Sequence, residues 1–485
     1  MTYEILIKNG TSIDGTGAPA RWADVGIAGG KIVEVGKLSG SARRTIDADG
    51  LVVAPGFIDP HTHYDAQICW DGATTPSSWH GVTSVVMGNC GVGIAPCRPG
   101  AREVAMRDLV NVEAIPFEVL NAGITWDWET FPQYMEAAQR RKPALNLAFL
   151  APLTPFRHYV MGEASMERAA GAEETAKIKF LLGEALDSGA FGFSSTLLNQ
   201  HLGYQGRPLA CRLASSDELK AYANVLRDLG RGAIEIALTR STGRVSEEEQ
   251  ALLEFLLDES QRPVTWLGMA SRPDEPEASF DTLERLERLI QRGGVPQVLC
   301  KPFVIQMDLR NPFSFADMAM WGPVFNQPVE TQKRFYRDPD FRGAFREELK
   351  RPHLFQGRWN RVEVLEVTSQ ALKSCERKSL AEIAHERRQD PLDTFFDLAL
   401  EDDLNIQYTM QQYHEEGIKQ LIGDSRTMIG LSDGGAHVNM LCDAGYCTYL
   451  LGTWVRERRA ITLEHAVSAS RRSRQIFLAS RIADG

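Results

Sequence analysis

The chain has 485 residues, of which 43% are hydrophobic and 24% charged, and its formal net charge is −11. This length and balance predict a globular protein with a large buried core. The acidic charge argues against a nucleic-acid partner, because a protein that neutralises phosphates needs a basic excess. No apolar run reaches the roughly 18 residues of a membrane span, and the N-terminus lacks the layout of a signal peptide. We therefore expect no nucleic-acid or membrane partner.

The eight cysteines follow no disulfide framework and include no Cys-x-x-Cys pair. In a chain of this size such cysteines are typical of free thiols in a reducing compartment. We therefore expect a cytoplasmic protein. We also expect a homo-oligomer, although no particular motif indicates the oligomeric state.

The first 55 residues predict a small β subdomain. Apolar and polar residues alternate in short segments separated by Gly-containing turns such as Gly29-Gly30, which is typical of strands. The segments cover residues 3–9, 24–28, 31–36 and 44–53. We assign residues 1–55 to this subdomain.

Residues 56–480 predict a β/α barrel or a doubly wound sheet, because strand-length apolar stretches alternate with helices. The apolar stretches resemble parallel strands that are buried on both faces. They lie at 52–59, 82–89, 145–153, 190–196, 233–239, 263–270, 296–305 and 428–434. Helices are predicted at 164–188, 216–230, 246–261 and 280–293, and two of them start with a Ser-x-x-Glu capping box.

Residues 306–400 interrupt this alternation and are rich in charged residues, Pro and aromatic residues. We interpret them as a mostly helical insertion over the mouth of the barrel. Two ordinary barrel helices with long loops are the alternative.

The strongest functional motif is His61-Thr62-His63, which follows the apolar segment VVAPGFIDP. Residues i and i+2 of a strand face the same side, so both imidazoles point together. Barrel enzymes carry their active sites at the carboxyl ends of the strands, and imidazole is a common ligand of zinc-like ions. The motif therefore predicts a metal site, with two packed or surface histidines as the alternative.

Two further motifs end predicted strands. Cys90, in Gly88-Asn89-Cys90-Gly91, offers a thiolate that could ligate a metal or act as a nucleophile, or it could be a small core residue. Asp433, in Ser432-Asp433-Gly434-Gly435, could approach a metal or accept a proton from water, or it could be a turn residue.

The motifs together resemble a known family. The segment IDADGLVVAPGFIDPHTH resembles the amidohydrolase superfamily, and HGVTSVVMGNCGVGIAP (80–96) and GLSDGGAH (430–437) resemble its D-aminoacylase, or N-acyl-D-amino-acid deacylase, group. The resemblance covers nearly the whole chain. It implies a (β/α)8 TIM-like barrel with a small N-terminal β-sandwich, in which zinc-activated water hydrolyses the amide of an N-acyl-D-amino acid. It also implies that His61, His63 and Cys90 ligate the zinc and that Asp433 lies at the metal as general base.

The sequence departs from this family at two metal ligands. D-aminoacylases carry two further histidines at the ends of middle strands, and these positions fall at Leu238 and at Leu267 or Gly268. The remaining His61, His63, Cys90 and Asp433 could hold one zinc ion or another divalent metal, or Asp433 could be the base and leave three ligands.

Other residues could support the metal site. Glu235 or Lys301 could compensate for the missing histidines, and Asp65 could orient a ligand histidine.

The C-terminus is a second departure from the family. Family members usually return to the β-sandwich with further strands. This sequence ends at Gly485, where that return would begin, so either a truncated chain or an incomplete sandwich is expected.

The leading hypothesis is a metal-dependent hydrolase of a C–N amide bond in a small molecule, with Asp433 as the base. Substrate contacts are expected from Tyr64, His80 and His437, although packing roles are open for Tyr64 and His80. A substrate carboxylate would need a cation such as Arg240 or Arg244, whereas a neutral amide, carbamate, lactam or cyclic imide would not.

Two other functions stay open. A metal-free hydrolase could use Cys90 as its nucleophile, in which case thiol alkylation inactivates it and chelators do not. A non-catalytic barrel could bind a ligand or scaffold an assembly, in which case Asp433→Asn changes no activity.

Overall fold

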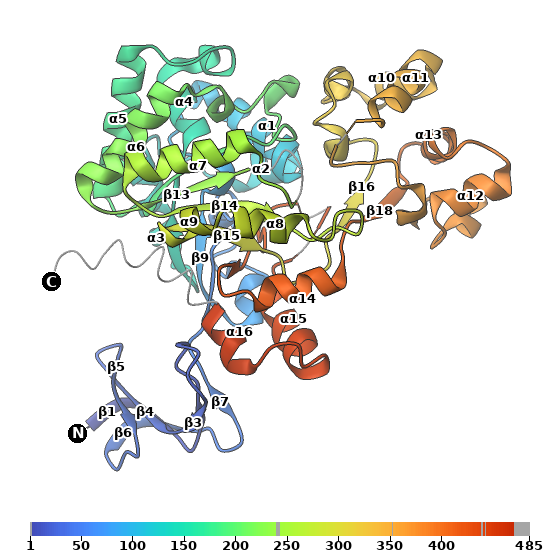
Figure 1. Ribbon diagram of the computed structural model, residues 1–485. Helices are drawn as coiled ribbons and strands as arrows, with labels where there is room; N and C mark the ends of the chain where they lie inside the picture. The colour runs from blue at the N-terminus through green and yellow to red at the C-terminus, as the bar shows by residue number, and fades with distance from the viewer. Residues whose placement is uncertain (1, 239–242, 352, 438–439, 442, 470–485) are drawn as a thin grey trace.

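The computed structural model describes residues 2–238, 243–351, 353–437, 440–441 and 443–469. The N-terminal strands form two small sheets, drawn in blue in Figure 1. One has the order β5-β4-β1-β6 and the other β3-β2-β7. The strands are β1 (Thr2–Lys8), β2 (Thr11–Ser12), β3 (Arg21–Trp22), β4 (Asp24–Ala28), β5 (Lys31–Gly36), β6 (Ser41–Asp47) and β7 (Val52–Val53).

A ring of parallel strands forms the centre of the molecule. Neighbouring strands of the ring pair in parallel and follow one another in chain order, with β16, β17 and β18 left out between β15 and β19, and the short strands β10 and β11 together take one position. The strands are β8 (Phe57–Asp59), β9 (Val82–Met87), β10 (Asn146–Phe149), β11 (Ala151–Pro152), β12 (Gly192–Thr196), β13 (Ala233–Ala237), β14 (Val264–Met269), β15 (Gly294–Val298) and β19 (Met428–Ile429). A parallel bridge between Thr62 and Gly434, just beyond β8 and β19, closes the ring.

Helices cover the outside of this ring, as a (β/α)8-barrel requires. They include α1 (Arg102–Glu113), α2 (Phe117–Gly123), α3 (Phe131–Arg140), α4 (Leu153–Met161), α5 (Ala172–Asp187), α6 (Ser216–Leu229), α7 (Glu247–Ser260), α8 (Ala278–Arg285), α9 (Glu287–Gln291), α14 (Glu415–Gly423), α15 (Tyr446–Tyr449) and α16 (Leu463–Ala469). Both predicted capping boxes are present, from Ser215 to Glu218 at α6 and from Ser246 to Glu249 at α7. The predicted helix 164–188 is shorter than expected, because Gly171 caps α5 and a separate 3-10 turn precedes it.

Between β15 and β19 the chain builds a separate packed unit, which lies to one side of the barrel in Figure 1. It contains an antiparallel sheet of β16 (Val304–Met307), β18 (Gln407–Gln411) and β17 (Val362–Glu366), and the helices α10 (Val329–Arg337), α11 (Pro339–Glu348), α12 (Leu380–Arg387) and α13 (Pro391–Glu401). Aromatic side chains fill its own core, with Phe315 stacked on Trp321 at 4.3 Å between ring centroids. The sheet is an addition to the mostly helical segment that composition predicts.

Within the described residues, no helix combines the length and the apolar character that crossing a membrane requires.

A buried ion pair ties the helical layer together. The Arg157 guanidinium on α4 contacts the Glu218 carboxylate at the start of α6, and both side chains are at most 1% exposed. Glu218 also accepts hydrogen bonds from the Tyr222 hydroxyl and from the backbone N–H of Ala170, at 3.0 and 2.8 Å. One carboxylate therefore satisfies a buried cation and anchors two neighbouring segments.

Glu218→Gln should lower the free energy of unfolding by about 3–5 kcal/mol, because it leaves the Arg157 charge buried without a counterion. Urea unfolding followed by tryptophan fluorescence measures this. Asp187→Asn is the matched control, because the Arg231–Asp187 pair is exposed and should contribute less than about 1 kcal/mol. Equal losses in both variants would contradict a special role for the buried pair.

Candidate metal centre

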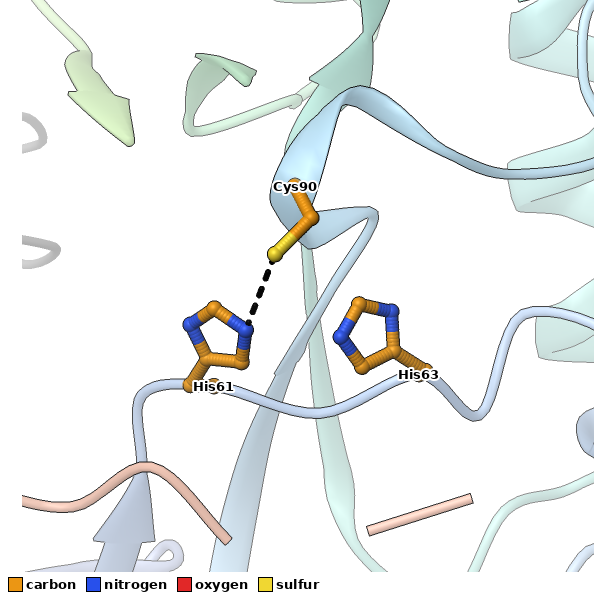
Figure 2. Close-up of side chains that lie close together, drawn as sticks. All are labelled: His61, His63 and Cys90. Atoms are coloured by element: carbon orange, nitrogen blue, oxygen red, sulfur yellow. Dashed lines mark hydrogen bonds between the residues drawn. The ribbon is translucent and has the colours of Figure 1, made fainter. Parts of the chain in front are cut away.

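Three predicted ligands meet at the carboxyl end of the strands. His61 and His63 follow β8, and Cys90 lies in a 3-10 turn after β9. Their ligand atoms all lie within 4.8 Å of one another, and all three residues are buried. Figure 2 shows Cys90 and the two imidazoles converging, with 3.4 Å between the Cys90 Sγ and the His61 Nε2.

The backbone around Cys90 is fixed by its neighbours. Cys90 adopts a left-handed φ of 56°, which is uncommon for a residue with a side chain and is often found at functional sites. Its N–H donates to Glu235 Oε2 at 2.7 Å. A Cβ on Gly88 would overlap the Leu150 carbonyl, and one on Gly91 would lie 2.9 Å from the Ser195 Cα. The two glycines of this motif therefore let the thiol turn approach the neighbouring strands closely.

Asp433 lies beside both histidines, on the segment that follows β19. Its Oδ1 is 3.4 Å from His61 Nε2 and 3.6 Å from His63 Nε2. Asp433 also adopts a left-handed φ, 48°, and its side chain is 17% exposed. It is therefore the partly accessible member of an otherwise closed cluster.

Each histidine turns its Nε2 toward the cluster, because its Nδ1 faces another polar group. His61 Nδ1 lies 3.1 Å from Gln297 Oε1 and 3.9 Å from Glu235 Oε1. His63 Nδ1 lies 3.3 Å from Glu113 Oε1. Metal-binding histidines usually present one ring nitrogen to the ion and the other to a carboxylate or carbonyl, as here.

Glu113, at the C-terminus of α1, faces two histidines. Its Oε2, the oxygen that does not face His63, lies 3.4 Å from His437 Nε2, and its backbone carbonyl accepts the N–H of His437 at 2.6 Å. Both carboxylate oxygens are buried without a well-formed hydrogen bond. Glu113 is thus held between His63 and His437 in the wall of the site.

Burial and crowding shift the pKa values of these groups. Burial raises the pKa of Glu235 to about 8 and that of the Cys90 thiol well above its ordinary value. Burial lowers the pKa of His61 to about 3. Burial also opposes charge on His63, but Glu113 and Asp433 outweigh it and raise the pKa to about 9. The chain therefore concentrates acidic groups around two imidazoles, which favours a bound cation.

The donor set fits a zinc-like ion. A tetrahedral site with bonds of about 2.0–2.3 Å separates its donors by about 3.3–3.8 Å. His61 Nε2 lies 3.4 Å from Cys90 Sγ and 3.4 Å from Asp433 Oδ1, and both separations match that spacing. Only His61, His63 and Cys90 form the compact cluster among the described residues, which leaves Asp433 beside it rather than within it.

A cavity opens next to the cluster. Polar residues line its floor, among them His63, Cys90, Asp433 and the predicted substrate contact His437. Residues of the barrel and of the insertion, including Leu267 and Phe303, line the rest.

Several residues predicted at the site lie elsewhere. Tyr64 is buried, with its hydroxyl 2.7 Å from Ser77 Oγ, and His80 lies 2.9 Å from Thr448 Oγ1; neither lines the cavity, which corrects their expected role. Arg244 is exposed and pairs with Glu275 at 2.8 Å, and Lys301 pairs with Asp443 at 2.8 Å. Arg240 lies outside the described residues.

The Asp65 carboxylate contacts the turn that carries Cys90. Its Oδ2 accepts the backbone N–H of Gly88 at 3.1 Å, so it supports the thiol turn. Glu113 takes the place beside His63, and sequence reasoning missed it because nothing in a helix-end glutamate indicates its spatial partner. Gln297, Gln200 and His201, which also lie at the site, were missed for the same reason.

The positions of the two absent histidines hold apolar residues. Leu238 is fully buried directly after β13, and Leu267 and Gly268 line the cavity from β14. Neither supplies a donor atom, so the described residues offer one compact ligand cluster.

Comparisons with known proteins agree with this fold. A family model described as the amidohydrolase family matches residues 44–318. The crystal structure of an N-acyl-D-glutamate deacylase from Bordetella bronchiseptica, complexed with zinc and a phosphonate inhibitor, superposes with a TM-score of 0.67 at 24% identity, over 99% of this chain and 87% of that one. A D-aminoacylase crystal structure superposes with a TM-score of 0.66 at 25% identity, over 97% and 85%. The predicted barrel fold is confirmed.

Proteins similar in sequence include a D-aminoacylase as well. A D-aminoacylase of Alcaligenes xylosoxydans xylosoxydans is 39% identical over 327 residues, which is 62% of this chain and 63% of that protein. The match thus spans less than two thirds of this relative. An uncharacterised protein of Mycobacterium tuberculosis is 28% identical over 90% of this chain and 74% of its own length.

Glu113→Gln should weaken zinc binding about 10–100-fold, because the carboxylate that faces His63 Nδ1 is replaced by a neutral amide. Titration against a chromophoric chelator measures the affinity. Glu118→Gln, an exposed position on α2, is the matched control. Unchanged zinc affinity in Glu113→Gln would show that this carboxylate does not position the histidine.

Proposed function

The chain belongs to the amidohydrolase family, and from this we propose that it is a metal-dependent hydrolase of a carbon–nitrogen amide bond in a small molecule. The observation that carries the proposal is the convergence of His61, His63 and Cys90, with Asp433 Oδ1 within 3.6 Å of both imidazoles. Relatives of this chain that are named D-aminoacylase, N-acyl-D-aspartate deacylase and N-acyl-D-glutamate deacylase support the reaction class.

His61 Nε2, His63 Nε2 and Cys90 Sγ would hold the metal, which we infer to be a single zinc ion. Such an ion lowers the pKa of a bound water and polarises a carbonyl group. Three protein donors are the usual number in catalytic zinc sites, which keep a position for substrate or water. A buried thiolate is costly alone, and a divalent cation compensates it.

Asp433 is the residue placed to move the proton. Its carboxylate is partly exposed at the cavity, and the His63 and His61 side chains hold its pKa below the ordinary value against the opposing effect of burial. An aspartate is ordinarily ionised at neutral pH, so Asp433 can accept a proton from the attacking water. The water oxygen bonds to the carbonyl carbon, the C–N bond breaks, and Asp433 returns the proton to the leaving nitrogen, so a carboxylic acid and an amine result.

The thiol-enzyme alternative fits less well. A nucleophilic Cys90 would need a nearby base, and burial lowers the pKa of its neighbour His61 to about 3. Burial, with Glu235 beside it, also raises the pKa of the Cys90 thiol well above its ordinary value, which disfavours a thiolate in the absence of a metal. A non-catalytic barrel explains neither the ionised Asp433 at the cavity nor the buried carboxylate behind His63. The deacylation of N-acyl-D-amino acids is one version of the proposed reaction. For the location of the protein we propose the cytoplasm, which agrees with the seven free cysteines among the described residues.

Purified wild-type protein should contain about one equivalent of zinc, and His61→Ala/His63→Ala should contain less than a tenth, because two of three donors are removed. Elemental analysis after growth in zinc-supplemented medium measures the content. His158→Ala/His385→Ala, which removes two histidines outside the cluster, is the control. A wild-type protein with less than a tenth of an equivalent of any transition metal would contradict the proposal.

Asp433→Asn should lower kcat about 10²–10⁴-fold while the zinc content stays close to one equivalent, because the variant loses the proton acceptor and keeps the three donors. Amide hydrolysis is followed by amine release, and Asp228→Asn, on the surface of α6, is the control. The wild-type protein should lose its activity when a chelator removes the zinc and regain it when zinc is added back. Activity that survives chelation but not thiol alkylation would favour the Cys90 enzyme instead.

A further inference from the structure

The cavity beside the metal cluster is apolar over most of its wall. Side chains from β14, from the segments after β15 and β19 and from the insertion line it, and they include Leu267, Met269, Leu299, Phe303, Phe313 and Met440. Such a surface binds hydrocarbon by removing it from water. A substrate group that fills this space is therefore apolar.

No Arg or Lys is found among the cavity-lining residues that the structure describes. The nearby cations are neutralised by other partners: Lys301 by Asp443, and Arg272 by Asp274, each at 2.8 Å. Two carboxylates, Glu113 and Asp433, face the cavity instead. A substrate carboxylate buried here would lose its hydration and meet acidic groups, which is strongly unfavourable.

Two polar side chains in this wall nevertheless have an atom without a hydrogen-bond partner. Gln200 and His201, in the loop after β12, line the cavity and are 7% and 5% exposed. Gln200 Oε1 and His201 Nδ1 are buried and have no hydrogen-bond partner. Buried polar atoms are normally satisfied, so these two indicate polar groups on a ligand.

The loop that carries them is held in place by its backbone. The His201 carbonyl accepts the N–H of Leu209 at 3.2 Å and a guanidinium N–H of Arg212 at 3.2 Å. Burial keeps the pKa of His201 well below its ordinary value. The imidazole is therefore a neutral hydrogen-bonding group and not a counterion for an anion.

We propose that the substrate is an uncharged amide, with apolar substituents in the cavity and its polar groups hydrogen-bonded by Gln200 and His201. The substrate class is an N-acyl amine, or the amide of an N-acyl amino acid, rather than the free acid. This inference depends on the proposed hydrolase function. Gln200 and His201 are specificity-determining residues, since a ligand without polar groups at these points leaves them unsatisfied.

Matched pairs of ligands test the proposal on the zinc-loaded protein. The pairs are the D- and L-enantiomers of N-acetyl- and N-octanoyl-leucinamide against the corresponding N-acyl-leucines. Release of acetate or octanoate gives kcat/KM, and the ligand-induced rise in Tm gives binding. The Tm measurement is repeated on chelator-treated protein, because a free carboxylate can ligate zinc directly.

The uncharged member of at least one pair should show a kcat/KM at least about tenfold above the acid and a larger rise in Tm. N-acyl-leucines that bind and react as well as the leucinamides, or better, would overturn the proposal. If Arg240→Ala then lost a preference for the acids, Arg240 would be the partner of the substrate carboxylate. Ligands that raise the Tm with the expected preference but are not hydrolysed would contradict the hydrolase function and leave the inference on binding intact. No rise in Tm with any uncharged ligand would overturn the inference.

Gln200→Leu supplies a second readout. It should raise KM for the preferred uncharged substrate about tenfold, with kcat within about twofold and with unchanged zinc content. Gln205→Leu, an exposed position in the same loop, is the matched control. Equal KM values in the two variants would show that Gln200 does not contact the substrate.

Discussion

The closure of the strand ring between β8 and β19 is the constraint on which the site depends. The N–H of His63 donates to the Gly434 carbonyl at 2.7 Å, and the N–H of Asp433 donates to the His61 carbonyl at 3.2 Å. These bonds hold the two-histidine segment against the last strand of the barrel. A Cβ on Gly435 would lie 2.8 Å from the His63 carbonyl carbon, and Gly435 has a φ of 91°, so this approach needs glycine. Without the closure, Asp433 would not lie beside the imidazoles.

Most of the barrel could be predicted from the sequence, because its strands and helices carry strong local patterns. The stretch AIEIA of β13 is fully buried, as a parallel strand covered on both faces should be, and Ser215 and Ser246 begin α6 and α7 as their capping boxes predict. The sheet of the inserted unit was not predicted. Its strands pair residues far apart in the chain, such as Val304 with Gln411, and no local pattern encodes such pairing.

The candidate site could be predicted only where sequence neighbours act together. His61 and His63 share one segment, and the glycines around Cys90 and Asp433 mark tight turns at strand ends. Glu113 could not be found in this way, because it ends an ordinary helix and meets His63 only through the fold. The same holds for Gln200, which carries no signal except its place after β12. Tyr64 and His80 show the opposite error, since closeness to a motif in sequence placed them wrongly in space.

Leu238 and Leu267 supply no donor atoms to the candidate metal centre. Where two further donors are expected from the resemblance, the chain presents hydrocarbon, and this is why a single ion is proposed for the described site. The same leucine at 267 belongs to the wall that faces the substrate. A leucine at position 267 therefore both removes a ligand from the metal site and makes the cavity more apolar.

X-ray absorption spectroscopy at the zinc edge identifies the atoms bound to the ion. We expect one sulfur at about 2.3 Å and two imidazole nitrogens at about 2.0–2.1 Å, with the remaining scattering from a light atom. The sulfur contribution should vanish in Cys90→Ser. A zinc shell made only of nitrogen and oxygen in the wild-type protein would contradict the assignment of His61, His63 and Cys90 as the metal site.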